Sequence, residues 1–553
     1  MSNNNDKYKN YSREELIDEL ETLKKKKYGL IWDKKNSQEM LDVFVNWENV
    51  PENFTPKQFP ILKEVKNKEI ETDKNKPTNL LIEGDNYHSL AVLNFTHQNK
   101  IDVIYIDPPY NTGNKDFIYN DKFIDKEDPF RHSKWLSFME KRLRLAHRLL
   151  KNTGVIFISI DDHEQAQLRL LCDEIFSEEN FVNNIIWKKT NSPKFQSANL
   201  GNQYEFVLVY AKDFSRLKLN RIYKPFDEKS LKPYSYEDSR GKFRLIELEA
   251  KGLQNNQNRK KAKFKDRIAP WVYSIETLEK WDKEGLIYKT NKGRYAKKQY
   301  LDDMEGVIIA DIWIDSGINP LQGSSEEYIG FETQKPLSLI KRILKLGSLK
   351  DNSIILDFFA GSGTTGQAIL ELNKEDNGNR KFILCTNDEE LDNNGNIKKH
   401  KICTDVCYPR IEKVIGGYKN SKGEKVAGLG GNLKYFKTDF VGSDSTDKNK
   451  RDLVNKSTEM ICIKENIFDL VADGGLDYRI YQKGKKFLGV IFELDAVADF
   501  KKEAEKHKGN FVVYCFSYTE TTPEKEFKGL KNKYVLKPIP AVILRIYLEI
   551  FKK

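Results

Sequence analysis

Apolar and polar positions along most of the chain follow two periods, which predict strands that alternate with helices. The apolar runs Leu80–Ile82, Ile101–Ile106 and Gly154–Ile160 are typical of buried strands. Charged segments with helical spacing lie near 134–150 and 163–176. This alternation predicts a doubly wound α/β sheet, in which ligands bind at the carboxyl ends of the strands.

The alternation stops after two further expected strands and returns in the second half of the chain. Residues 212–320 are rich in Lys, Arg, Tyr and Asn and show no regular period. A helix near 336–347, a buried strand over Ser353–Phe359, another helix and a strand at 381–386 then predict a second βαβ unit. We therefore expect one α/β core that is interrupted by an inserted domain.

The two ends of the chain differ from this core. Ser12 and Glu15 fit a capping box at the start of an amphipathic helix over 12–27, and the polar stretch from about 34 to 76 is expected to be a connector with short helices. A glycine- and asparagine-rich stretch near 416–433 is expected to begin a smaller domain. That domain alternates helices with strands, near 486–493 and 510–517.

Composition and charge limit the class of protein. The 553 residues exceed one compact core, and 39% hydrophobic with 32% charged residues is typical of a folded chain. Six irregularly spaced cysteines favour a reducing compartment, and neither a signal peptide nor an apolar run of the roughly 20 residues that span a membrane is present. We expect a cytoplasmic protein with no membrane contact. The net charge of +10 is a mild indication of a polyanionic partner.

A metal site is not expected. His400, Cys403 and Cys407 form the single cluster that resembles a ligand set, and no fourth ligand of the usual spacing accompanies it.

The tetrapeptide Asp107-Pro108-Pro109-Tyr110 directly follows an expected strand, where an α/β sheet places its active site. The prolines stiffen the turn and lack N–H donors, so carbonyl groups stay free to accept hydrogen bonds. Asp107 and the Pro108 carbonyl would accept the two hydrogens of an amino group on a planar heterocycle, and Tyr110 would stack on the ring. A lone Pro-Pro turn is more often structural, but a second motif favours the functional interpretation.

The second motif, Phe358-Phe359-Ala360-Gly361-Ser362-Gly363-Thr364, connects a buried strand to a helix. Its glycines let the backbone approach a nucleoside closely, and a helix N-terminus favours electronegative groups. It is not a phosphate loop, because no Gly-Lys-Ser/Thr follows. Alone, a Gly-x-Gly turn is weak evidence for a ligand.

Together, the two motifs resemble the amino-methyltransferases of DNA. Asp-Pro-Pro-Tyr resembles their catalytic motif, and Phe-x-Gly-x-Gly resembles their S-adenosylmethionine loop. The catalytic motif precedes the cofactor loop by about 250 residues, which is the circularly permuted order of the β class. The resemblance covers residues 77–430. Tyr-Gly-Leu-Ile-Trp at 28–32 and the two terminal extensions are similar to modification (Mod) subunits of Type III restriction-modification systems.

The resemblance implies a Rossmann-like, doubly wound methyltransferase sheet in permuted order. The expected domains are an N-terminal helical extension and connector (1–76), the catalytic half of the core (77–211), a target-recognition domain (212–325), the S-adenosylmethionine-binding half (326–430) and a C-terminal α/β domain (431–553).

The resemblance also implies roles for single residues. Asp85, after Gly84, would accept from the adenine amino group of the cofactor, although an N-cap is an equally good interpretation. Thr333-Gln334-Lys335-Pro336 would open the helix before the glycine loop and contact the methionine part, and an acid after 381–386 would hold the ribose. The expected cofactor-binding residues are Asp85, Asn86, Thr333, Lys335, Pro336, Asp357, Phe358, Phe359, Ala360, Gly361, Ser362, Gly363, Thr364, Thr365, Asn387, Asp388 and Glu389; the catalytic residues are Asp107, Pro108, Pro109 and Tyr110.

The chemistry that fits these motifs is direct methyl transfer to an exocyclic amino group. Methylation of cytosine C5 requires a Pro-Cys nucleophile, and the chain contains no Pro-Cys. Asp107 favours N6 of adenine by resemblance, and N4 of cytosine is the alternative. RNA or protein glutamine as acceptor fits less well with the large insertion. A non-catalytic DNA-recognition subunit that positions a nuclease is a further alternative.

The basic middle segment is expected to bind double-stranded DNA. The candidates are Arg259, Lys260, Lys261, Lys263 and Lys265, with the 255–258 asparagine tract and 289–298 beside them. A lysine run is more often a solvated face, so the prediction concerns the region. The resemblance further implies a homodimer and a separate restriction subunit with helicase and nuclease activity, since no Walker loop or nuclease cluster is recognisable here.

Overall fold

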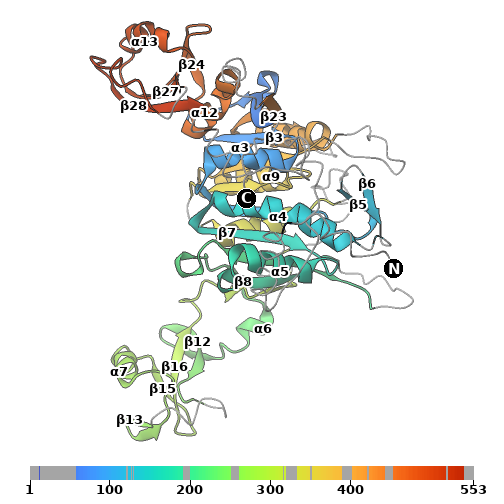
Figure 1. The fold of residues 1–553 in the computed structure, drawn as a ribbon. Helices are drawn as coiled ribbons and strands as arrows, with labels where there is room; N and C mark the ends of the chain where they lie inside the picture. The colour runs from blue at the N-terminus through green and yellow to red at the C-terminus, as the bar shows by residue number, and fades with distance from the viewer. Residues whose placement is uncertain are drawn as a thin grey trace. The chain divides into compact units, whose positions relative to one another are not determined.

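The computed structural model of the protein divides into two compact units (Figure 1). Unit 1 comprises residues 1–220 and 311–553, and unit 2 comprises residues 221–310. The structure describes residues 12, 58–119, 122–125, 128, 130–190, 200–250, 261–315, 317–318, 333–348, 351–388, 401–419, 423–442, 453–517, 521–540 and 543. Apart from Ser12, the helix expected over 12–27 and the motif at 28–32 lie outside these residues. No helix among the described residues is both long and apolar enough to cross a bilayer.

Within the described residues, a mixed sheet of eleven strands forms the centre of unit 1. Its strands lie in the spatial order β1 (Gln58–Glu64), β23 (Asn432–Gly442), β3 (Thr78–Glu83), β20 (Lys381–Thr386), β19 (Ile354–Asp357), β4 (Ile101–Ile106), β7 (Leu150–Ile160), β9 (Tyr204–Ala211), β8 (Phe181–Lys188) and β18 (Ile312–Trp313), and β2 (Ile70–Glu71) pairs with β23. The five strands from β3 to β7 run parallel. The predicted α/β class with a largely parallel central sheet is confirmed.

Helices cover both faces of the sheet. One group consists of α3 (Asn86–His97), α4 (Arg131–Leu149) and α5 (Gln165–Phe176); the other consists of α8 (Leu337–Gly347), α9 (Thr364–Asp376) and α10 (Tyr408–Gly416). Successive side chains of a strand point to opposite faces. Ile104 of β4 accordingly packs in the cluster that contains α3 and α4 residues, whereas Val103 lies beside Gly347 at the end of α8.

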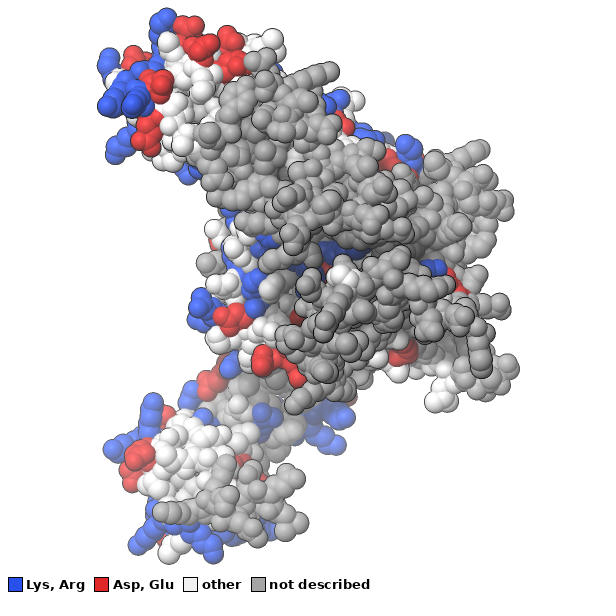
Figure 2. Space-filling view, viewed as in Figure 1, with Lys and Arg blue, Asp and Glu red and all other residues white. Residues whose placement is uncertain are grey.

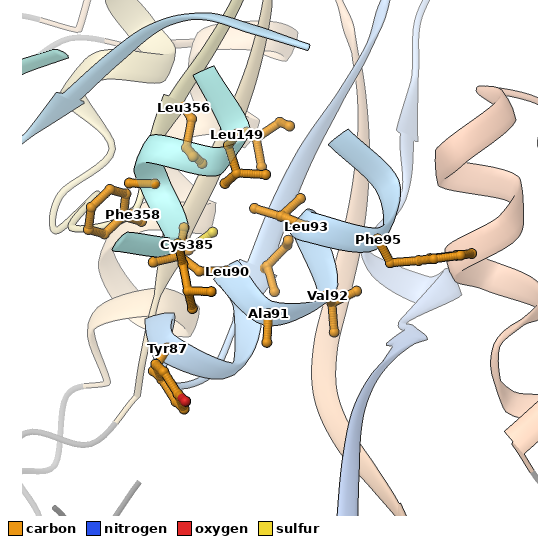
Figure 3. Packing of buried hydrophobic residues seen from close by; sticks show 14 of the residues in the cluster. Tyr87, Leu90, Ala91, Val92, Leu93, Phe95, Leu149, Leu356, Phe358 and Cys385 are labelled. Carbon is orange, nitrogen blue, oxygen red and sulfur yellow. The ribbon is translucent and has the colours of Figure 1, made fainter. Parts of the chain in front are cut away.

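The face of α3 that meets the sheet is largely apolar. Figure 3 shows Leu90 beside Cys385 of β20 and Leu93 beside Leu149 of α4. Leu90, Leu93, Leu149 and Cys385 are all fully buried. Burial of such side chains contributes roughly 1.5–3 kcal/mol each, so this packing holds the two halves of the chain together.

Three expected segments differ from the structure. In the described part of the expected connector, residues 58–64 form strand β1, which pairs with β23. The strand expected over Ser353–Phe359 ends at Asp357, because Phe358 and Phe359 already lie in the turn before α9. The residues after the glycine-rich stretch form β23, which pairs with β3, so the core sheet extends to Gly442 beyond the expected boundary at 430.

A second sheet lies near the C-terminus. Its strands, in order, are β24 (Asp469–Asp473), β25 (Tyr478–Lys483), β26 (Lys486–Ile491), β27 (Asn510–Ser517) and β28 (Lys533–Pro540). β26 and β27 match the expected strands. Helix α13 (Val497–Ala504) packs its buried Phe500 against this sheet.

Unit 2 has its own small core. Its four-stranded antiparallel sheet has the order β11 (Tyr236–Asp238), β12 (Gly241–Glu247), β16 (Tyr295–Tyr300) and β15 (Ile287–Lys289), and the hairpin β13 (Ala262–Phe264)/β14 (Arg267–Ala269) and helix α7 (Ile275–Lys283) complete it. Phe264, Trp271, Leu278 and Tyr295 form the buried cluster.

Candidate functional site

Four of the segments singled out in the sequence follow neighbouring parallel strands and therefore meet at one edge of the sheet. Asp85 follows β3, Asp388 follows β20, Asp357 ends β19 and Asp107 follows β4. β19 pairs with β4, with Leu356 opposite Ile104. Adjacent strands are about 4.8 Å apart, so the Asp107 tetrapeptide and the glycine loop lie side by side although they are far apart in the sequence.

The carboxylate of Asp107 belongs to a buried polar cluster. The Tyr110 hydroxyl lies 3.0 Å from Asp107 Oδ1 and 3.1 Å from Glu205 Oε2. Lys335 Nζ lies 2.9 Å from Asp107 Oδ2 and 3.6 Å from Glu205 Oε2. Lys189 Nζ completes the cluster, 3.4 Å from Glu205 Oε1. The Tyr110 hydroxyl therefore contacts both carboxylates, Lys335 lies between the same two carboxylates, and Lys189 contacts Glu205.

Burial and mutual attraction set the charges of this cluster. Burial raises the pKa of Asp107 above its ordinary value, and the adjacent Lys335 limits the rise. Burial by itself would favour a neutral Lys335, but Asp107 and Glu205 more than offset it, so the pKa of Lys335 is raised and the amine stays charged. Burial and the two carboxylates raise the pKa of Tyr110 well above its ordinary range. At neutral pH the phenol is a hydrogen-bond donor.

Hydrogen bonds to Pro109 and Asn111 fix the turn that carries Asp107. Trp135, which is fully buried on α4, donates its indole N–H to the Pro109 carbonyl at 2.7 Å. Asn111 has a positive φ of 59° and donates to Glu164 Oε1 at 2.5 Å. Among the described residues, no donor reaches the Pro108 carbonyl.

The glycine loop turns sharply above a buried acid. Gly361 and Gly363 have φ values of 48° and 78°, which side chains with a Cβ rarely adopt. Asp357 beneath them accepts from the Phe359 N–H at 3.0 Å and the Thr365 hydroxyl at 2.5 Å. Burial raises the pKa of Asp357 to about 7, although both hydrogen bonds lower it. The side chain of Asp357 therefore supports the loop.

Two hydroxyl groups of the loop point to α10 and not to the open edge of the sheet. Arg410 donates to Ser362 Oγ at 3.1 Å and to Thr364 Oγ1 at 2.8 Å. Ser362, Thr364 and Thr365 are all buried. Their side chains thus act within the protein, which leaves the backbone and Phe359, Ala360 and Gly361 as the parts of the loop nearest to a ligand.

Asp85 and Asn86 share one arginine as a partner, and Asn86 also contacts the residue that precedes the glycine turn. Arg142, fully buried on α4, donates to Asp85 Oδ2 at 3.0 Å and to Asn86 Oδ1 at 2.5 Å. The Asn86 amide in turn donates to the Phe358 carbonyl at 2.7 Å. Asp85 also caps α3 by accepting from Tyr87 N at 2.7 Å. The N-cap interpretation therefore holds geometrically, and the Asp85 side chain remains 32% exposed.

The remaining expected cofactor residues are spread around the same edge. Asp388 accepts from the Thr404 N–H at 3.0 Å, and its neighbour Asn387 is partly buried. Glu389 lies outside the described residues. Pro336 is the N-cap of α8, and Thr333 is exposed. Lys335 directs its ammonium group to Asp107 and Glu205, a placement that the resemblance did not imply.

Glu205 and Lys189 are the site residues that the sequence did not single out. Glu205 is 8% exposed and is the one charged residue in the otherwise uncharged strand β9. A buried carboxylate inside an apolar strand requires a partner, and that oddity was the available signal. Lys189 directly follows β8 and carries no such signal.

Two residues of the cluster with His400 lie among the described residues. Cys403 and Cys407 are buried, and Cys407 Sγ packs beneath Gly363. Among the described residues, no group of three His, Cys, Asp or Glu is placed to hold a metal ion; His400 lies outside them.

Unit 2 carries most of the excess positive charge. Residues 221–310 contain 21 Lys and Arg against 14 Asp and Glu, a net charge of +7 out of the +10 of the whole chain. Figure 2 shows these basic side chains at the surface, interspersed with acidic ones. Lys261 and Lys263 are exposed and have no ion pair with a described residue, whereas Lys265 pairs with Asp282. Arg259 and Lys260 lie outside the described residues.

Comparison with known proteins identifies relatives over most of the chain. A family model described as DNA methylase matches residues 101–396, which include Asp107 and the glycine loop. The Type III restriction-modification enzyme StyLTI Mod subunit of Salmonella typhimurium is 34% identical over 508 residues, 84% of this chain and 77% of that protein. The EcoPI Mod subunit of Escherichia phage P1 is 29% identical, covering 71% of this chain and 69% of that protein. The Type II methyltransferase M.KpnI of Klebsiella pneumoniae is 29% identical, covering 62% and 89%.

Proposed function

The chain belongs to the DNA methylase family, and from this premise we propose that it transfers the methyl group of S-adenosylmethionine to N6 of an adenine flipped out of duplex DNA. We further propose that it is the modification subunit of a Type III restriction-modification system. The observation that carries the proposal is the pairing of β4 with β19, because it puts the acceptor residues of the Asp107 tetrapeptide beside the glycine loop.

The residues at the sheet edge fit S-adenosylmethionine, which supplies an electrophilic methyl group on sulfur when bound. The positive φ values of Gly361 and Gly363 let the backbone approach a nucleoside without a Cβ in the way. The carboxylates of Asp85 and Asp388 follow β3 and β20. Asp85 would accept from the adenine amino group of the cofactor, and Asp388 would accept from the ribose hydroxyls. Asn86 holds the Phe358 carbonyl in place.

The acceptor residues activate the target nitrogen by hydrogen bonding. A conjugated amino group is a poor nucleophile, and its lone pair becomes available when both hydrogens are accepted. Asp107 and the free Pro108 carbonyl would accept them, stabilising charge as it develops. Tyr110 would stack on the base, worth roughly 1–3 kcal/mol, and recover part of the cost of flipping.

DNA is the macromolecular substrate, and unit 2 is proposed as the domain that reads it. Its net charge of +7 and the exposed Lys261 and Lys263 support contact with phosphates. The relatives StyLTI and EcoPI are Mod subunits, so a restriction subunit is the expected partner. We also propose that the chain forms a homodimer, as the resemblance implies. Sedimentation analysis of the purified chain tests this assembly.

The experiment is transfer of labelled methyl from S-adenosylmethionine to genomic DNA, followed by nucleoside analysis. We expect N6-methyladenine with the unaltered chain and none with Asp107→Ala, while Asp107→Ala keeps its affinity for S-adenosylmethionine in calorimetry. Label in N4-methylcytosine would show the wrong acceptor. If the unaltered chain transfers no label to DNA, the result supports the alternative of a non-catalytic recognition subunit. Sequencing of the methylated DNA maps the target site.

A further inference from the structure

The ammonium group of Lys335 makes two contacts that the proposed reaction assigns to the target amino group. Its Nζ lies 2.9 Å from Asp107 Oδ2, at hydrogen-bond distance from the acceptor. The same atom lies 4.9 Å from the centroid of the Tyr110 ring, on which the base is expected to stack. The amino nitrogen of a flipped base therefore competes with Lys335 for the same acceptor and the same aromatic face.

We propose that Lys335 holds the place of the target amino group while no base is bound, and that Glu205 receives the ammonium when the base enters. The inference rests on the proposed function, since it concerns the same acceptor, Asp107, and the same aromatic ring, Tyr110. It assigns Glu205 as a positioning residue that acts through Lys335 and not on the substrate.

Glu205 is built to act as the receiving group. Its Oε2 is already 3.6 Å from Lys335 Nζ, so a small rotation of the flexible lysine side chain exchanges one carboxylate for the other. The Glu205 carboxylate is held in place by the Tyr110 hydroxyl at 3.1 Å and by Lys189 Nζ at 3.4 Å. The lysine side chain is therefore the part that moves. Glu205 is 8% exposed, so water solvates its carboxylate poorly and does not replace the Lys335 ammonium as its partner.

Charge gives the reaction a reason to require this exchange. The target nitrogen gains positive charge as its bond to the methyl carbon forms, until it loses a proton. An ammonium group left on Asp107 would oppose that charge and occupy the acceptor. Moved to Glu205, the same ammonium keeps the two buried carboxylates compensated while Asp107 turns to the base. A static ion pair, in contrast, would merely stabilise the empty site.

The two roles differ in how the variants combine. In single-turnover methyl transfer on DNA with a mapped target site, at saturating S-adenosylmethionine, plateau rate constants are taken from profiles over pH 6 to 9.5. We expect Glu205→Gln to be about tenfold slower, the effect of one lost charge-assisted hydrogen bond, because Lys335 then stays on Asp107. Adding Lys335→Met to Glu205→Gln should recover most of the loss, since no ammonium remains to be moved.

Lys189→Met is the matched control, because Lys189 contacts Glu205 but has no contact with Asp107 in the structure. Added to Glu205→Gln, it should recover nothing. The inference is overturned if the Lys335→Met, Glu205→Gln double variant is no faster than Glu205→Gln. It is also overturned if Lys335→Met weakens S-adenosylmethionine binding about tenfold or more in calorimetry, because Lys335 would then serve the cofactor.

Failure of the proposed function is recognised separately. It shows as an unaltered chain that transfers no methyl group to the amino group of adenine. Failure of the present inference shows as an active unaltered chain whose double variant gains nothing.

Discussion

Asp357 lies beneath the glycine loop with a carboxyl group that is 2% exposed. Burial is the largest influence on it, and it raises the pKa; the hydrogen bonds from Thr365 and Phe359 lower it, and the charge of Asp107 raises it again. The outcome is a pKa of about 7, against an ordinary value of 3.8. The folded protein thus holds a proton on Asp357 that the unfolded chain releases in mild acid.

The sign of the effect on stability follows from this difference. Below pH 3.8 the carboxyl is protonated in both states, and no stability is lost. Between pH 3.8 and about 7 only the unfolded chain loses the proton, so the free energy of unfolding falls as the pH rises. Above about pH 7 the loss is complete. At about 1.4 kcal/mol per unit of pKa, a rise of roughly three units amounts to about 4 kcal/mol.

The substitution Asp357→Asn removes this titration and keeps the size of the side chain. We expect the free energy of unfolding of the variant, relative to the unaltered protein, to increase by about 2 kcal/mol from pH 5 to pH 7, and by only a few tenths of a kcal/mol more from pH 7 to pH 8. Urea unfolding followed by tryptophan fluorescence at pH 5, 6, 7 and 8 measures it. The difference between the two proteins cancels every group that titrates equally in both.

Thr365→Val provides the matched variant, because it removes a hydrogen bond that lowers the pKa of Asp357. The pKa should rise further, and the loss of stability should extend to higher pH. A difference between Asp357→Asn and the unaltered protein that changes by less than about 0.5 kcal/mol over this range would refute the reasoning.

Four further substitutions test other parts of the protein. Tyr110→Ala should weaken capture of the flipped base by roughly 1–3 kcal/mol and leave S-adenosylmethionine binding unchanged, as DNA titration and calorimetry would show; equal losses for both ligands would contradict this. Lys261→Ala and Lys263→Ala should each reduce the slope of log K against log salt for DNA binding by about 1, and an unchanged slope would remove that lysine from the interface. Arg142→Met leaves Asp85 without its buried partner and should lower stability by roughly 3 kcal/mol, measured by urea unfolding; a change below about 1 kcal/mol would show that the pair contributes little.

The elements around the site were predictable because each depends on local sequence. Strand β4 and the helix after it follow from hydrophobic period, and the break at Pro108 and Pro109 follows from missing N–H donors. Gly361 and Gly363 lie in the loop expected between a buried strand and a helix, and the structure gives both a positive φ. Family resemblance supplied the cofactor and the order of the halves, which periodicity does not contain.

Pairings between distant segments were not predictable in this way. Strand β1 lies in a stretch that was expected to be a polar connector, and its partner β23 comes more than 370 residues later in the chain. Register and partner choice depend on which edges remain open once the core has formed, and no local pattern records that.

The residue types in the two motifs were sufficient to specify the chemistry, because a carboxylate, a free carbonyl and a flexible glycine turn have their properties wherever they lie. Which groups share the pocket was decided by packing alone. Glu205 in β9, Lys189 after β8 and Lys335 before α8 come from three separate segments, and nothing local in any of them shows that they meet. Lys335 joins Asp107 to Glu205, and Lys189 contacts Glu205. Buried charges are tolerated only where opposite charges compensate them, and folding brings these charges within reach of one another.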